Sequence, residues 1–258
     1  MIAAMNDSRV KRVPILGIEL ASVTISEAVD YSRLGGLILA PSGPGLCDLS
    51  TDPDYRQALR QADLNLPDSG LAILMMRLLG MGALPRTSGL GFLEGLLQEP
   101  YMQEPGVSFW IMPSKASMER NLVWLKKRGI RVTEEDCYVA PIYPRLGPVQ
   151  DEDLKKILIS RRPQYLFICT GSGTQEKLGF WFREQLPYRP AICCIGAAIG
   201  FLSGDQVGIP QWADRLCLGW LIRCLADPPK YLPRYFKSVK LIGLLLKYRE
   251  QAPATIVS

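Results

Sequence analysis

The fold class is decided by the stretch Gln164-Tyr-Leu-Phe-Ile-Cys-Thr170, which runs straight into Gly171-Ser-Gly-Thr174 and the aromatic-rich segment 175–186. The first part is an apolar run of strand length, the second is a glycine-rich turn, and the third has the length of a helix. A further apolar run at 191–195 predicts the next strand. Strand, short loop, helix and strand in this order predict a unit of a parallel sheet.

The same alternation extends toward the N-terminus. Strands are predicted within residues 13–18, 37–40, 64–66, 107–112 and 130–132, and helices after the capping box Thr24-Ile-Ser-Glu27 and over 53–62, 70–80, 114–128 and 151–161. Strands that alternate with helices of about 10 to 15 residues predict an α/β fold: a mostly parallel, Rossmann-like sheet with helices on both faces. After Gly204 the composition shifts to Trp, Arg and Pro. We therefore expect a catalytic α/β domain over 1–204 and a helical C-terminal appendage over 205–258.

Composition narrows the possible chemistry. The 258 residues include no histidine, which excludes Ser-His-Asp and Cys-His nucleophiles and histidine-based zinc sites. The seven cysteines form no C-x-x-C motif and lie mostly in apolar runs, as expected of free thiols in a reducing compartment. The longest uncharged apolar stretch, 191–204, is shorter than the ~18 residues of a membrane span, and the N-terminus lacks a signal-peptide apolar region. A cytoplasmic protein is expected.

The positive charge is concentrated near the C-terminus. Residues 215–250 contain eight Lys and Arg against two acidic residues, whereas the whole chain has a net charge of only +5. Within 234–248, helical spacing places Tyr235, Val239, Ile242 and Leu246 on one face and Arg234, Lys237 and Lys240 on a neighbouring face. Such a helix either lies in the interface of an anionic membrane or packs its apolar stripe on the core. We favour the membrane.

Four segments carry candidate chemistry or border a candidate site. Asp68 follows a predicted strand in L-P-D-S-G, where it would act as a general base or, alternatively, cap a helix. The loop Gly171–Thr174 leads into a helix N-terminus, so it is either an anion site or an ordinary tight turn. Asp52-Pro-Asp54 has the D-x-D pattern of a metal site, but Asp and Pro also crowd helix starts, and we favour capping. The loop around Ser42, after another strand, is a candidate wall of the site.

A series of motifs resembles one family in order and spacing. It comprises T-G-S-G-T-Q-E (170–176), I-G-A-A-I-G-F-L-S-G (195–204), I-P-Q-W (209–212) and L-G-W-L-I-R-C-L-A-D-P-P-K-Y-L-P-R-Y (218–235). Upstream, L-G-I, L-P-D-S-G and R-T-S-G fall in register. Over residues 13 to 245 the chain therefore resembles the WecG/TagA/CpsF glycosyltransferases.

The resemblance implies an inverting transfer of a sugar, such as N-acetylmannosamine, its uronic acid or another hexose, without metal or cofactor. The donor would be a UDP-sugar and the acceptor a polyprenyl-diphosphate-linked sugar, used in bacterial cell-surface polysaccharide synthesis at the inner face of the cytoplasmic membrane. An anionic membrane surface is the further expected partner, and nucleic acid is not expected. Asp68 would be the catalytic base, and substrate would be bound by Arg86, Gln175, Arg223 and Arg234, which match family positions. The expected substrate-binding set is completed by Ser42 and Gly171, which are candidates because their loops follow predicted strands.

The chain also departs from the family pattern. The family's T-x-N is here Ala40-Pro-Ser42, its P-K before Q-E is Gly173-Thr174, and its E-W is Gly219-Trp220. These losses keep a second interpretation open, a degenerate member that binds nucleotide-sugar or lipid diphosphate without turnover. A Rossmann-type oxidoreductase is a weaker third interpretation, because no G-x-G-x-x-G motif with a later ribose-binding acid is present.

Overall fold

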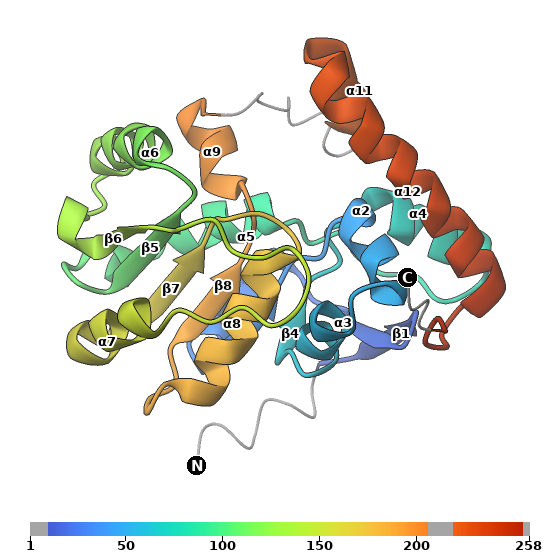
Figure 1. Ribbon diagram of the computed structural model, residues 1–258, viewed down its shortest axis with the longest axis horizontal. Coiled ribbons are helices and arrows are strands. Elements are labelled where there is room, and N and C mark those ends of the chain that lie inside the picture. Colours follow the sequence, from blue (N-terminus) through green and yellow to red (C-terminus); the bar gives the residue numbers. More distant parts are fainter. Residues whose placement is uncertain (1–9, 206–218, 255–258) are drawn as a thin grey trace.

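A six-stranded parallel sheet forms the centre of the molecule (Figure 1). The computed structural model describes residues 10–205 and 219–254, without several side chains of the last two helices. The strands are β3 (Gly36–Leu39), β4 (Leu64–Asn65), β5 (Ser108–Met112), β6 (Cys137–Val139), β7 (Tyr165–Ile168) and β8 (Ala191–Cys194), in the order β4-β3-β8-β7-β5-β6. The predicted α/β class is confirmed.

Helices cover both faces of the sheet (Figure 1). One apolar layer joins the sheet to α3 (Pro53–Arg60), α7 (Glu152–Arg161) and α8 (Thr174–Gln185). The other joins it to α1 (Ile25–Ser32), α5 (Gly89–Leu97), α6 (Lys115–Lys127) and α9 (Ala198–Ser203). Successive strand residues alternate between the layers: Leu37 and Leu39 are buried in the first and Ile38 in the second. Because both faces are covered, the central strands β3, β7 and β8 are apolar without interruption, as parallel strands usually are.

Two predicted strands differ from the structure. The run at 13–18 is not one strand but two, β1 (Arg12–Ile15) and β2 (Ile18–Ala21), which form an antiparallel hairpin outside the main sheet. Leu16 and Gly17 between them have positive φ angles of 49° and 76°, so the chain reverses there. Residues 130–132 form no strand; a short 3₁₀ helix, η5 (Glu134–Asp136), follows them, and β6 starts at Cys137.

The C-terminal segment packs on the short helices beside β3 and β4. These helices are α2 (Gly43–Leu46), η3 (Cys47–Ser50) and α4 (Gly70–Leu78). Elsewhere in the fold, a further 3₁₀ helix, η4 (Pro100–Gln103), follows α5. After α11 (Gly219–Ala226), the long helix α12 (Pro228–Tyr248) lies against α2, η3 and α4. Within the described ranges, no helix is long and apolar enough to cross a membrane.

The side of α12 that faces the core is not the predicted apolar stripe. Leu241 and Leu245 are fully buried there, whereas Val239 and Leu246 are 59% and 60% exposed. The interpretation that the stripe packs on the core is therefore wrong for Val239 and Leu246. The helix carries two apolar stripes, and the periodicity of the sequence does not tell which of them faces inward.

The amino-terminal edge of the sheet is held by Asp63, just before β4. Its Oδ2 accepts hydrogen bonds from the amide of Leu37 at 2.7 Å and from Nε of Arg183 at 3.0 Å. Its Oδ1 accepts from Nη2 of Arg189 at 2.6 Å. One carboxylate thus joins β3, the end of α8 and the segment before β8.

We expect Asp63→Asn to lower the free energy of unfolding by about 2 kcal/mol, because two arginines lose their charged partner near a buried amide. Urea unfolding followed by circular dichroism measures this. The control Asp153→Asn removes an exposed pair with Lys156 and should leave the unfolding midpoint close to that of the wild type. Equal midpoints for the wild type and Asp63→Asn would contradict the expectation.

Candidate functional site

The candidate site lies where β3, β8 and β7 end. The chain leaves β3 through Ala40–Ser42 and enters α2, which lies on the face of the sheet that α3 and α8 cover. It leaves the adjacent strand β8 through Gly196 into α9, on the opposite face. Neighbouring strands whose following helices diverge to opposite faces open a crevice, and ligands of open α/β sheets bind in it.

Asp68 lies in the loop after β4 and is half-buried. It is not the N-cap of α4, because the hydroxyl of Ser69 accepts the capping bond from the amide of Ala72 at 3.3 Å. Instead, Oδ1 of Asp68 accepts a hydrogen bond at 3.1 Å from the amide of Gly89, the first residue of α5. Nε of Arg86 donates to the main-chain carbonyl of Asp68 at 3.1 Å. The capping interpretation thus holds only in part: the carboxylate binds the positive end of a different helix.

Gly89 brings this carboxylate to the crevice. A Cβ added to Gly89 would lie 3.0 Å from Cβ of Ala40 and 3.5 Å from Cβ of Ile195. The start of α5 therefore packs directly against the ends of β3 and β8. Any larger residue at position 89 would push α5, and the amide that holds Asp68, away from the strand ends.

The loop with Ser42 meets the loops after β4 and β7. The Ser42 hydroxyl caps α2 by accepting from the amide of Gly45 at 3.3 Å. A Cβ added to Gly45 would lie 2.7 Å from the hydroxyls of both Ser172 and Tyr55, and one added to Gly43 would lie 3.0 Å from that of Ser69. Several hydroxyl groups thus gather around the start of α2.

The first turn of α8 holds a chain of hydrogen bonds between two loops. The amide of Gly196 donates to Oε1 of Gln175 at 3.0 Å, and Nε2 of Gln175 donates to Oε1 of Glu176 at 3.0 Å. Oε2 of Glu176 accepts from the amide of Gly173 at 2.7 Å. Burial raises the pKa of the Glu176 carboxyl to about 7, against the opposing effect of these donors.

These hydrogen bonds occupy part of the predicted anion site. The Gly173 amide at the start of α8 is bound by the protein's own Glu176, and the side chain of Gln175 is buried. Gly171 keeps open space at its α-carbon, with a φ angle of 102°. The loop around Gly171 therefore leaves room for a ligand. Gln175, which follows this loop, connects it to the loop after β8 by its bond with Gly196.

Asp52 caps a helix, as favoured from the sequence. Its Oδ1 accepts from the amide of Tyr55 at 2.9 Å, and its Oδ2 pairs with Nζ of Lys177 at 3.0 Å. Nothing in the sequence pattern indicates this lysine, because it lies in a helix with many polar residues. Across the part of the chain that the structure describes, no group of three or more Cys, Asp or Glu side chains is arranged to hold a metal ion.

The two predicted arginines of the C-terminal segment belong to α11 and α12. The backbones of Arg223 and Arg234 lie in these helices, but their side chains are outside the described residues. The predicted residues Ser42, Asp68, Arg86, Gly171 and Gln175 come together around the crevice. Gly89, Glu176 and Lys177 support them and were not predicted.

Comparison with known proteins assigns the chain. The model of the Glycosyl transferase WecG/TagA/CpsF family matches residues 13–254. One curated relative, N-acetylglucosaminyldiphosphoundecaprenol N-acetyl-beta-D-mannosaminyltransferase of Bacillus spizizenii (strain ATCC 23059 / NRRL B-14472 / W23), is 23% identical over 245 residues, 91% of either chain. Because the family match extends from β1 to beyond α12, the chain belongs to the WecG/TagA/CpsF family of glycosyl transferases.

Proposed function

We propose that this protein transfers a sugar from a UDP-sugar to a polyprenyl-diphosphate-linked acceptor in bacterial surface polysaccharide synthesis, with Asp68 as the general base. The observation that carries the proposal is the position of the Asp68 carboxylate, held by the Gly89 amide beside the crevice. The name of the Bacillus relative suggests lipid-diphosphate-linked N-acetylglucosamine as acceptor and an N-acetylmannosaminyl donor. A uronic acid or another hexose as donor sugar fits the proposal equally well.

The proposed reaction is a single displacement with inversion. An acceptor hydroxyl attacks the anomeric carbon from the side opposite UDP, so that a new C–O bond forms while the bond to the diphosphate oxygen breaks. Asp68 takes the hydroxyl proton and later releases it to water, and proton transfer of this kind contributes typically 10² to 10⁴ in rate. Arg86, Arg223 and Arg234 would neutralise the charge that builds on the departing diphosphate.

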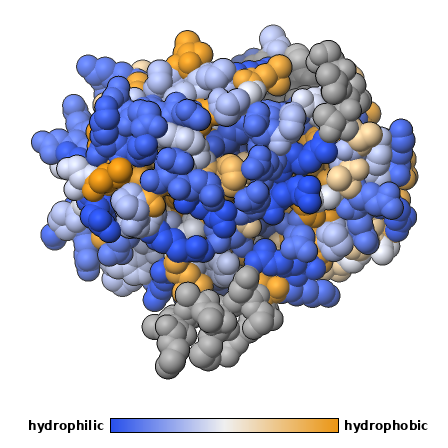
Figure 2. All heavy atoms as spheres, turned by 60° about the horizontal axis from the view of Figure 1, so that its bottom comes forward, coloured by the Kyte–Doolittle hydropathy of each residue, from blue (hydrophilic) through white to orange (hydrophobic). Residues whose placement is uncertain are grey.

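A membrane-facing side would bring the lipid-linked acceptor to the site. Large apolar side chains on α4, α11 and α12 are each more than half exposed: Leu74, Leu78, Leu225, Phe236, Val239 and Leu246. Figure 1 draws these three helices along one side of the molecule. By contrast, the face in Figure 2 is mainly hydrophilic. We propose that residues 205–258 form an appendage that, together with α4, docks on the inner face of the cytoplasmic membrane and covers the site.

We expect Asp68→Asn to lower kcat at least 100-fold without loss of the fold, because an amide cannot take the acceptor's proton. UDP release with a lipid-diphosphate acceptor measures kcat, and circular dichroism checks the fold. The control Asp54→Asn, in the first turn of α3, should keep wild-type turnover. Near-wild-type turnover by Asp68→Asn would assign Asp68 a structural role only.

The same assay separates turnover from binding alone. A wild-type protein that binds UDP-sugars but releases no UDP with any of several donors would favour the degenerate interpretation. That interpretation draws on Ala40, an apolar and buried residue where the family pattern has a polar one.

Turnover should survive incubation with excess EDTA, because arginines can carry the diphosphate charge and Asp52 is already bound to Lys177 and Tyr55. UDP release before and after chelation measures this. Complete loss that magnesium or manganese restores would overturn the expectation and point to a metal held together with the substrate.

We expect the protein to cosediment with anionic vesicles and to be partly released as salt rises from 0.1 to 0.5 M (roughly a twofold fall in Debye length), since part of the attraction is electrostatic. Phe236→Ser/Val239→Ser should weaken vesicle binding at least tenfold by removing apolar area. The control Val123→Ser changes an exposed valine on α6 and should bind as the wild type. Equal vesicle binding by the wild type, the double variant and the control would exclude α12 as the docking element.

A further inference from the structure

A buried ion pair lies behind the crevice and has no part in the mechanism above. The ammonium of Lys177 and Oδ2 of Asp52 are 3.0 Å apart, and the two side chains are only 2% and 7% exposed. Removing two charges from water is costly, and a buried pair rarely adds to stability overall. Lys177 also donates to a third group, the main-chain carbonyl of Arg145, at 2.8 Å. Through this contact, the ion pair holds the backbone of Arg145 in place.

The pair fixes the middle of a long loop. We call residues 140–149, between β6 and α7, the strap. At its far end Asp151 caps α7 and accepts hydrogen bonds from the hydroxyls of Tyr138 at 3.1 Å and Tyr143 at 2.7 Å. Val149 is buried in the core. In the middle of the strap, Lys177 binds the main-chain carbonyl of Arg145. The strap is therefore held against the first turn of α8.

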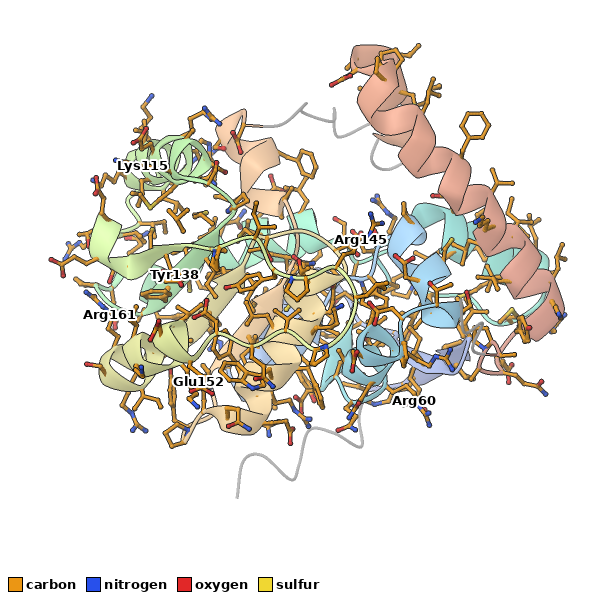
Figure 3. The ribbon with its side chains drawn as sticks, in the orientation of Figure 1. Arg60, Lys115, Tyr138, Arg145, Glu152 and Arg161 are labelled. Carbon is orange, nitrogen blue, oxygen red and sulfur yellow. The ribbon has the colours of Figure 1, made fainter. Side chains whose placement is uncertain are left out.

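The side chain of Arg145 points outward from this fixed backbone. It is exposed, and within the described part of the chain its guanidinium makes no hydrogen bond or ion pair. Figure 3 shows it extending from the strap toward α2, on the side where β7 and β8 end. Lys177 lies about one helical turn after the loop Gly171–Gly173, so the strap passes next to the crevice.

We propose that Arg145 binds the diphosphate of the nucleotide-sugar donor and that Lys177 and Asp52 are the residues that position it. The inference rests on the proposed function. The carboxylate of Asp68 lies beside this crevice, and the Gly173 amide at the start of α8 is already bound by the buried Glu176 instead of being open to a phosphate. A guanidinium, always charged and shaped for two phosphate oxygens, supplies positive charge from the strap, in addition to the arginines proposed above.

Arg145→Gln tests the phosphate contact. We expect its affinity for UDP, measured by calorimetry, to fall at least tenfold, while its affinity for uridine stays within twofold of the wild type. The matched control Arg60→Gln changes an exposed arginine of α3 that Figure 3 shows away from the strap, and should bind UDP as the wild type. Unchanged UDP affinity in Arg145→Gln would overturn the inference alone. Absence of UDP binding in the wild type would overturn the proposed function as well.

The positioning role has a separate readout. Lys177→Met would strand a buried carboxylate, so the paired change Asp52→Asn/Lys177→Met is used. Trypsin should cut the Arg145–Leu146 bond at least tenfold faster in this variant at an unchanged unfolding midpoint, and UDP should slow the cut in the wild type. Adding Arg145→Gln to the paired variant should change UDP affinity less than twofold. Full additivity, or equal cleavage rates, would show that the pair does not position Arg145.

Discussion

The Glu176 carboxylate receives two donors, the Gly173 amide and the side-chain amide of Gln175. Because both partners donate, the orientation of Gln175 is fixed, and its oxygen must face the Gly196 amide. The next residue, Lys177, reaches Asp52 and the carbonyl of Arg145. The first turn of α8 therefore ties together the loops after β6, β7 and β8 and the start of α3. The geometry of the crevice depends on this turn.

The turn reaches the crevice because α8 lies unusually close to the sheet. A Cβ added to Gly179 would lie 2.7 Å from Sγ of Cys194 and 2.9 Å from Cδ1 of Leu37. Only glycine allows the helix to approach β8 and β3 so closely. On the other face of the sheet, Gly89 does the same for α5 and so for Asp68. Two glycines, one on each face, thus set the distance at which the polar groups of the site meet.

The sequence predicts the strands and helices well where apolar runs are continuous, as at 164–170 and 191–195. It does not predict the hairpin at 12–21, because the reversal depends on Leu16, a residue type that rarely takes a positive φ angle. The grouping of Asp68, Arg86 and Gln175 follows from the family resemblance rather than from periodicity. Lys177 could not be found in this way, since a lysine in a helix is usually at the surface and its buried partner is 125 residues away.

The first hairpin is completed by the last described residues. The amides of Leu16 and Gly17 donate to the carbonyls of Arg249 and Glu250, both at 2.8 Å, and Gly17 packs against Ala252. During synthesis these bonds form only after residues 249–252 have left the ribosome, long after the sheet can assemble. The end of α12 is then fastened to the beginning of the chain. A polypeptide interrupted before residue 249 therefore lacks the bonds that anchor this helix, and its C-terminal face stays unfinished.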